Sequence, residues 1–235
     1  MSRRIKNDFE KLIRFFGSYS IEPNIKNAEF QTFLSTYHKR YFAYLTFIAE
    51  LSQYQSKALL SGLNESQYRF YTESCSDCGL ALFDSVNGNY KGSRLLQRSS
   101  IENFMKAISL DEDMTIDQEK NVYTLFERAK VISFFSIETT KNLFDIIHQQ
   151  YKELCKDVHT ATINNMVQLS ALNTLPSFDV AQAKRVEVVV LSLIPAYVTL
   201  LALKYNAFYH TIHYENKDVI QTTLIKEYAN IINNI

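Results

Sequence analysis

Hydrophobic residues recur at intervals of three and four along most of the 235-residue chain, the spacing that places side chains on one face of an α-helix. Polar or helix-breaking stretches interrupt this pattern at Pro23, Asn64, 87–89, 111–113, Ser136, 175–177 and Asn216. They separate predicted helices at about 3–16, 27–62, 65–86, 90–109, 117–134, 138–158, 179–211 and 217–233. Several exceed the mean helix length, so the pattern predicts an all-α fold, a single-domain bundle of long antiparallel helices over residues 1–235.

Composition supports this fold class. The chain has only five glycines and three prolines, whereas average usage would give roughly 12% of these residues together. Turn-rich β-sandwiches and glycine-rich phosphate loops are therefore excluded. With 16 Phe and 15 Tyr, the chain has enough apolar surface for one substantial core.

Charge is balanced at 25 basic and 25 acidic residues, so no overall field draws the protein to nucleic acid or to an anionic membrane, and any such binding must be local. Residues 1–16 carry five basic side chains and lack a continuous apolar run, which predicts a short basic amphipathic helix and not a signal peptide. Three cysteines do not make a disulfide framework, which favours a cytoplasmic location.

An apolar, uncharged stretch of sixteen residues spans Val188–Leu203. It is shorter than the roughly 20 residues needed to cross a bilayer, and Glu187 and Lys204 bound it. We therefore expect a buried core helix and no membrane partner.

Candidate metal ligands are sparse. Cys75-Ser76-Asp77-Cys78 is a lone CxxC pair inside a predicted helix, whereas a closed zinc site needs four ligands. Cys155 and His159 would complete a site only if two helices met, and His210 with His213 could share a metal at i and i+3. Partly buried thiols and a tyrosine-rich helix face explain these residues more simply, so we expect no metal and no cofactor.

Charged side chains fall unexpectedly on the helix predicted at 90–109. On a helical wheel its apolar face is formed by Ile101, Phe104, Met105 and Ile108. Arg94, Arg98 and Glu102, spaced i, i+4 and i+8, lie within or beside that face. Because an unpaired buried charge costs several kcal/mol, they must be paired, hydrogen-bonded or exposed to a cleft. The pattern indicates either a structural Arg98–Glu102 pair or a polar site between helices.

Residues 142–159 repeat this arrangement. Their apolar face is formed by Leu143, Phe144, Ile147, Tyr151, Leu154 and Val158, and a narrow stripe along its edge by His148, Lys152, Cys155 and His159. A histidine at such an edge can respond to neighbouring charges and act in general acid–base catalysis. The simpler interpretation is a structural histidine.

The order of these elements resembles the HEPN superfamily (higher eukaryotes and prokaryotes nucleotide-binding domains). The resemblance is carried by Gly88-Asn89-Tyr90, Ser93 and 98–102 (Arg-Ser-Ser-Ile-Glu), followed about fifty residues later by 151–159 (Tyr-Lys-Glu-Leu-Cys-Lys-Asp-Val-His). It covers roughly residues 65–170, which would form a HEPN-like core with extra N-terminal and C-terminal helices.

The resemblance implies a homodimeric helical protein that, in active members, is a metal-independent endoribonuclease. It places the acid–base histidine at His159. Where the family has an arginine separated from the histidine by four to six residues, this chain has Lys152, with six residues between it and His159, and a lysine lacks the bidentate fork. Either Lys152 serves, or Arg98 reaches across from the neighbouring helix, or the site is not catalytic. Glu102 and Tyr151 would orient these cations.

Two functions follow from these patterns. One is an RNA-cleaving or RNA-binding effector in toxin–antitoxin or anti-phage defence, which leaves a 2′,3′-cyclic phosphate, with Lys91, Arg94 and His148 as further substrate contacts. Residues 90–106 carry four basic residues against Glu102, a local net charge of +3 that could meet phosphate. The alternative is a non-catalytic interaction or dimerisation module. The expected partners are RNA or a nucleotide, a second copy of the chain, and an antitoxin or defence protein.

Overall fold

The computed structural model describes residues 3–55, 63–158 and 168–234, and every regular element within these ranges is helical, which confirms the predicted fold class. In chain order the elements are α1 (Arg3–Gly17), α2 (Glu22–Ile25), α3 (Ala28–Gln55), α4 (Glu65–Val86), α5 (Tyr90–Ser109), η1 (Ile116–Gln118), α6 (Val122–Lys130), η2 (Ser133–Ser136), α7 (Glu138–Val158), η4 (Leu172–Thr174), α8 (Val180–Lys204), α9 (Asn206–Tyr209), α10 (Tyr214–Gln221) and α11 (Lys226–Asn234).

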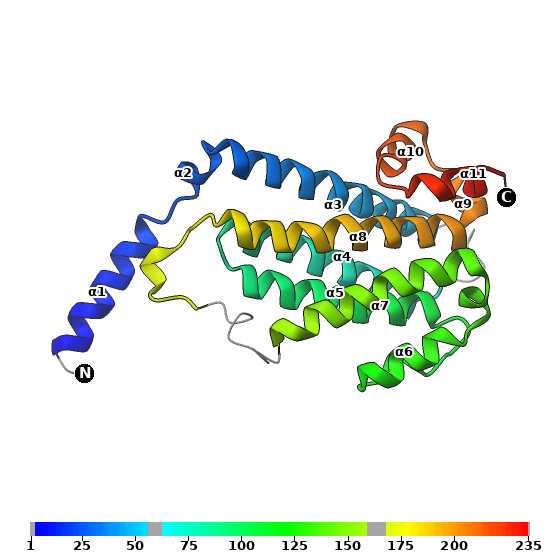
Figure 1. Cartoon of the computed structure of the whole chain (residues 1–235), viewed down its shortest axis with the longest axis horizontal. Helices are drawn as coiled ribbons and strands as arrows, with labels where there is room; N and C mark the ends of the chain where they lie inside the picture. Colours follow the sequence, from blue (N-terminus) through cyan, green and yellow to red (C-terminus); the bar gives the residue numbers. More distant parts are fainter. Residues whose placement is uncertain (1–2, 56–62, 159–167, 235) are drawn as a thin grey trace.

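Five long helices, α3, α4, α5, α7 and α8, lie side by side along the long axis of the molecule (Figure 1). Helix α5 packs against α4, α7 and α8. Helix α1 projects from one end of the bundle, and α9, α10 and α11 lie at the other end (Figure 1). Buried side chains from α3 to α11 form one hydrophobic core, to which no described residue of α1 or α2 contributes.

Asparagine or aspartate begins most of the long helices. Such a side chain accepts a hydrogen bond from a backbone N–H that has no partner within the helix. The acceptors are Asn27 (α3), Asn64 (α4), Asn89 (α5), Asn121 (α6) and Asp179 (α8). At α4 the cap is reciprocal, because Gln67 N donates to Asn64 Oδ1 at 2.8 Å and Asn64 N donates to Gln67 Oε1 at 3.0 Å.

Helices α4, α5 and α7 have the predicted bounds, whereas three other predictions are wrong in length. The segment 117–134 is divided into η1, α6 and η2, and 179–211 into α8 and α9. The segment 217–233 is divided between α10 and α11. The hydrophobic period of the sequence continues across these breaks and gives no sign of them. Helix α3 ends at Gln55, and the remainder of the predicted 27–62 lies outside the described residues.

The acidic run 111–113 is a loop at one end of the bundle, and its three residues fasten three different elements. Asp111 pairs with Lys204 at the end of α8 (2.8 Å). Glu112 accepts a hydrogen bond from the backbone at the start of η2 (2.6 Å). Asp113 accepts one from Arg128 Nε on α6 (2.7 Å). This run therefore explains how the chain turns from α5 into the short helices before α7.

Tyrosine is prominent in the core. Tyr44 donates to Ser74 Oγ (3.1 Å), and Tyr37 donates to the Cys78 carbonyl (3.1 Å). The rings of Phe104 and Tyr197 are stacked with their centroids 3.9 Å apart. Each of these tyrosines is fully buried, so the helices are joined by apolar contact and by hydroxyl hydrogen bonds at the same positions.

Among the described residues, one helix, α8, is long and apolar enough to cross a membrane, judged by length and composition alone. Most of its apolar stretch is buried against the other helices, including Val189, Leu193, Tyr197 and Leu201. The prediction of a buried core helix at Val188–Leu203 is thus confirmed.

Candidate functional site

Helices α5 and α7 carry the two predicted sites, and they pack against each other. The apolar faces meet as the helical wheels predict, with Ile101 and Phe104 of α5 and Leu143 and Ile147 of α7 all fully buried. Because Arg98 and Glu102 lie at the edge of the apolar face of α5, the packing brings these two charged side chains against the Tyr151 hydroxyl of α7 at one margin of the interface.

Arg98, Glu102 and Tyr151 form a hydrogen-bonded cluster at this margin. Arg98 Nε and Nη2 both donate to Tyr151 Oη, at 3.1 and 2.9 Å. The Tyr151 hydroxyl donates to Glu102 Oε1 at 3.2 Å, and Arg98 Nη2 lies 3.3 Å from the same oxygen. The Arg98 side chain is 24% exposed and that of Glu102 is 31% exposed. Both interpretations of the spacing therefore hold, since the Arg98–Glu102 pair forms and it belongs to a polar cluster between helices.

Protonation in the cluster follows from burial and from these contacts. Burial raises the pKa of the Tyr151 hydroxyl well above its usual range, Glu102 raises it further, and Arg98 opposes the shift. Burial lowers the pKa of Arg98, but Tyr151 and Glu102 outweigh that effect and leave it raised. Tyr151 is therefore a neutral hydrogen-bond donor that holds a permanently charged guanidinium in one orientation.

His148 lies one turn before Tyr151 on α7 and stacks on Phe126 of α6, with ring centroids 4.4 Å apart. Phe126 also contacts the Tyr151 ring, at 5.1 Å. Burial and the charge of Lys152 lower the pKa of His148. The histidine is therefore neutral at neutral pH, and Lys152 lies exposed on the same helix. Helical periodicity gave no reason to expect Phe126 in this group, because it lies on a third helix.

Other residues predicted to contact substrate lie elsewhere. Arg94 is buried and donates to the Arg185 carbonyl on α8 (3.1 Å), so its guanidinium contacts α8. Lys106, which counts only toward the local net charge of 90–106, donates to the Asp117 carbonyl (3.1 Å). Lys91 is exposed in the first turn of α5, and at 1.5 Å per residue it lies about 10 Å along the axis from Arg98. The local net charge of +3 is therefore divided among separate environments.

His159, the predicted acid–base residue, lies outside the described residues, as does the rest of 159–167. Helix α7 continues to Val158, immediately before it.

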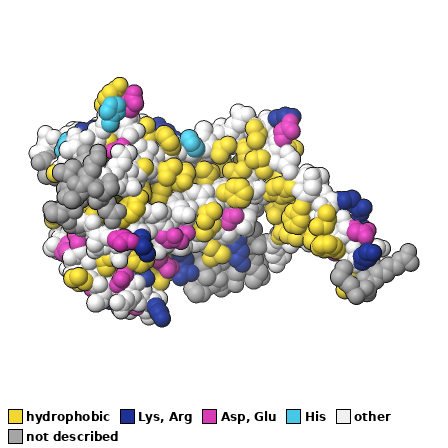
Figure 2. Space-filling model, turned by 180° about the vertical axis from the view of Figure 1, so that it is seen from behind, with side chains coloured by type: hydrophobic (Ala, Val, Ile, Leu, Met, Phe, Trp, Pro, Cys, Tyr) yellow, Lys and Arg dark blue, Asp and Glu magenta, His cyan; other side chains and the backbone are white. Residues whose placement is uncertain are grey.

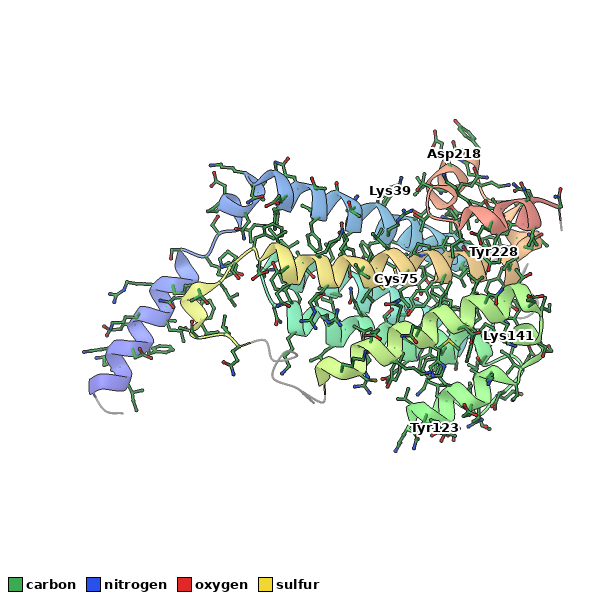
Figure 3. The ribbon with its side chains drawn as sticks, viewed as in Figure 1. Lys39, Cys75, Tyr123, Lys141, Asp218 and Tyr228 are labelled. Atoms are coloured by element: carbon green, nitrogen blue, oxygen red, sulfur yellow. The ribbon has the colours of Figure 1, made fainter. Side chains whose placement is uncertain are left out.

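Cys75 lies inside the bundle (Figure 3). Cys78, three residues later on α4, is also buried, and its Sγ is 3.2 Å from Ser100 Oγ. Burial raises the pKa of Cys75, and it raises that of Cys78 to about 12, so both thiols stay protonated and neither is a ready metal ligand or nucleophile. No group of three or more metal-ligating side chains occurs in the described part of the chain. Cys155 is half-buried and lies one turn after Tyr151 on α7.

Two glycines shape the turn that leads into α5. Gly88 has a positive φ of 83°, and a Cβ there would lie 2.6 Å from the Ser177 carbonyl oxygen. A Cβ at Gly92 would collide with the side chains of Asn89 and Asp84. These glycines allow the cap at Asn89 and thereby set where α5 starts.

The cluster can present a fixed, partly exposed guanidinium to an anion. Comparison with protein-family models, with curated proteins and with solved structures finds no match to this chain.

Proposed function

We propose that the protein is a HEPN-like effector that binds RNA and cleaves it without a metal, in a toxin or anti-phage defence role. One observation carries the proposal: the two helices that bear the motifs are joined through Arg98, Tyr151 and Glu102. Residues 49 to 53 positions apart in the chain thus share one polar cluster.

In this proposal the RNA 2′-hydroxyl attacks the adjacent phosphorus, the 5′-oxygen leaves, and a 2′,3′-cyclic phosphate forms. His159 accepts the 2′-hydroxyl proton, and Arg98 with Lys152 stabilises the charge that develops on phosphate. Tyr151 and Glu102 act as positioning residues for the Arg98 guanidinium. His148 and Lys91 extend the contact surface, while the buried Arg94 supports α5 from the α8 side.

The test is incubation of purified protein with total RNA and tRNA in EDTA, followed by detection of 2′,3′-cyclic phosphate ends. Loss of general acid–base or phosphate-stabilising groups should reduce cleavage by about a hundred-fold or more in His159→Ala and Arg98→Ala. Arg98→Lys keeps the charge but loses the fork, so it should also be impaired. Arg69→Ala and His213→Ala remove exposed counterparts and should cleave normally.

Equal cleavage by the wild type, His159→Ala and Arg98→Ala would contradict the assignment of these residues. In cells, wild-type expression should slow growth and His159→Ala expression should not.

A second function, a non-catalytic interaction module, is favoured by how the basic residues of α5 are used. Arg94 and Lys106 donate to backbone carbonyls inside the protein, and Arg98 is held by Tyr151 and Glu102. This leaves fewer cations directed toward solvent than the sequence charge indicates. If the wild type cleaves no RNA but forms a dimer that Arg98→Ala disrupts, this second function is the correct one.

A further inference from the structure

Helix α1 presents an apolar stripe to solvent. Phe9, Ile13 and Phe16, spaced i, i+4 and i+7, are 51%, 53% and 57% exposed. The spacing puts them on one face of the helix. Figure 2 shows hydrophobic side chains gathered along α1, which projects from the bundle, with Lys and Arg side chains beside them. Large apolar residues concentrated on one exposed helix face indicate an interaction surface.

A different side of α1 anchors the helix to the bundle. Leu12 and Phe15 are half-buried and line a hollow together with residues 171–173 around η4. Just after α1, Tyr19 donates a hydrogen bond to Asn87 at 2.6 Å. The stripe of Phe9, Ile13 and Phe16 therefore faces solvent, while the side of α1 that carries Leu12 and Phe15 faces the rest of the protein.

The charge of α1 differs from that of the remaining chain. Residues 3–17 include five basic and two acidic residues, a net of +3, so the rest of the neutral chain carries −3. Lys6, Lys11 and Arg14 are exposed. Lys6 lies seven residues before Ile13 and so on the side of the stripe, whereas Lys11 and Arg14 lie on other sides of the helix and border the hollow at 171–173. This excess of positive charge thus lies on the same helix that exposes the apolar stripe.

We propose that α1 binds the surface of an anionic lipid membrane, lying in the plane of the interface. Phe9, Ile13 and Phe16 would insert at the boundary between headgroups and acyl chains, and the basic side chains would contact the anionic headgroups. This inference departs from the expectation of no membrane partner, which rests on the zero net charge of the whole chain and on the short apolar stretch of α8.

The positive charge and apolar stripe of α1 favour an anionic membrane over two other binding partners, a second copy of α1 and nucleic acid. A second copy of α1 carries the same +3, so pairing the two helices would bring like charges together. Nucleic acid would contact the basic side chains but would leave the apolar stripe in water. An anionic bilayer is complementary to both faces at once.

The first experiment is flotation of the full chain with vesicles of phosphatidylcholine alone or with about 30% phosphatidylserine. The protein should bind the anionic vesicles and not the neutral ones, and salt should weaken binding. Phe9→Ser with Phe16→Ser should weaken it by roughly ten-fold or more for each site. Lys6→Gln and Lys11→Gln should each weaken it by about five-fold. The matched control is Phe42→Ser with Phe83→Ser, which removes exposed phenylalanines from the bundle.

The second experiment uses the absence of tryptophan from the chain. Phe16→Trp places a single fluorophore on the stripe, and its emission should shift to the blue with anionic vesicles, whereas that of Phe83→Trp should not. No shift for Phe16→Trp, or equal binding to neutral and anionic vesicles, would overturn the proposal. So would a double Phe9→Ser, Phe16→Ser variant that keeps vesicle binding, or one that instead loses dimerisation or RNA binding.

Discussion

The Tyr151 hydroxyl illustrates how one polar atom at a core margin organises its neighbours. It accepts two hydrogen bonds from Arg98 and donates one to Glu102, so both of these charged groups have a hydrogen-bond partner. The sequence alone makes a pair between Arg98 and Glu102, at i and i+4, foreseeable. The tyrosine between them belongs to the other helix, and only its position on the apolar face of 142–159 suggested that it would come near.

Gly88 has a backbone conformation that strains any residue with a side chain. Gly88→Ala should lower the free energy of unfolding by at least about 1–2 kcal/mol, because a left-handed φ strains any residue with a Cβ. The new Cβ would also press on the Ser177 backbone. Urea denaturation followed by circular dichroism measures the loss.

Gly17→Ala is the matched control for that change, since a Cβ at Gly17 has nothing within 4 Å. It should leave the free energy of unfolding within about 0.5 kcal/mol of wild type. A Gly88→Ala protein as stable as the Gly17→Ala protein would show that the turn before α5 is not constrained as described.

At the scale of elements, the helix starts are set by short-range contacts. Asn or Asp caps account for α3, α4, α5, α6 and α8. The breaks between later helices have no comparable sequence signal, because the apolar period continues through them. Helix starts were therefore easier to foresee than the breaks at 205 and 222.

Asn64→Ala tests the cap of α4. It should reduce the free energy of unfolding by about 1 kcal/mol, because the backbone N–H of Gln67 loses its acceptor and the reciprocal bond loses its support. Thermal and urea unfolding measure the change. Asn7→Ala, at an exposed position inside α1, should cause no loss, since alanine favours a helix interior; an equal loss in both variants would argue against the cap.

At the scale of the whole molecule, the tyrosine-rich core makes stability sensitive to alkali. Burial raises the pKa of Tyr37, Tyr44, Tyr71 and Tyr197 well above 10.0, and that of Cys78 from 9.0 to about 12. Below pH 9.0 these groups are protonated in both the folded and the unfolded chain, so the free energy of unfolding has its full value there. Above 9.0 the unfolded chain loses the Cys78 proton, and above 10.0 those of the tyrosines, while the folded protein retains them.

We therefore expect the free energy of unfolding to fall by several kcal/mol between about pH 10 and 11, at about 1.4 kcal/mol per pH unit for each such group. This pH dependence can be checked by following the ultraviolet absorbance of tyrosinate as the pH is raised. The buried tyrosines should ionise only together with unfolding. Ionisation of all tyrosines in one step before unfolding would contradict the expected pH dependence.

The sequence by itself determined the helical class, the bounds of α4, α5 and α7, and which face of α5 and α7 is buried. These properties depend on periodicity and on caps that act within about four residues. Only the tertiary structure decided that Arg98 turns to α7 while Arg94 turns to α8, and that Phe126 covers His148. A helical wheel gives the angle of a side chain about its own axis. Which helix lies at that angle depends on packing between residues that are about 20 to 90 positions apart in the chain.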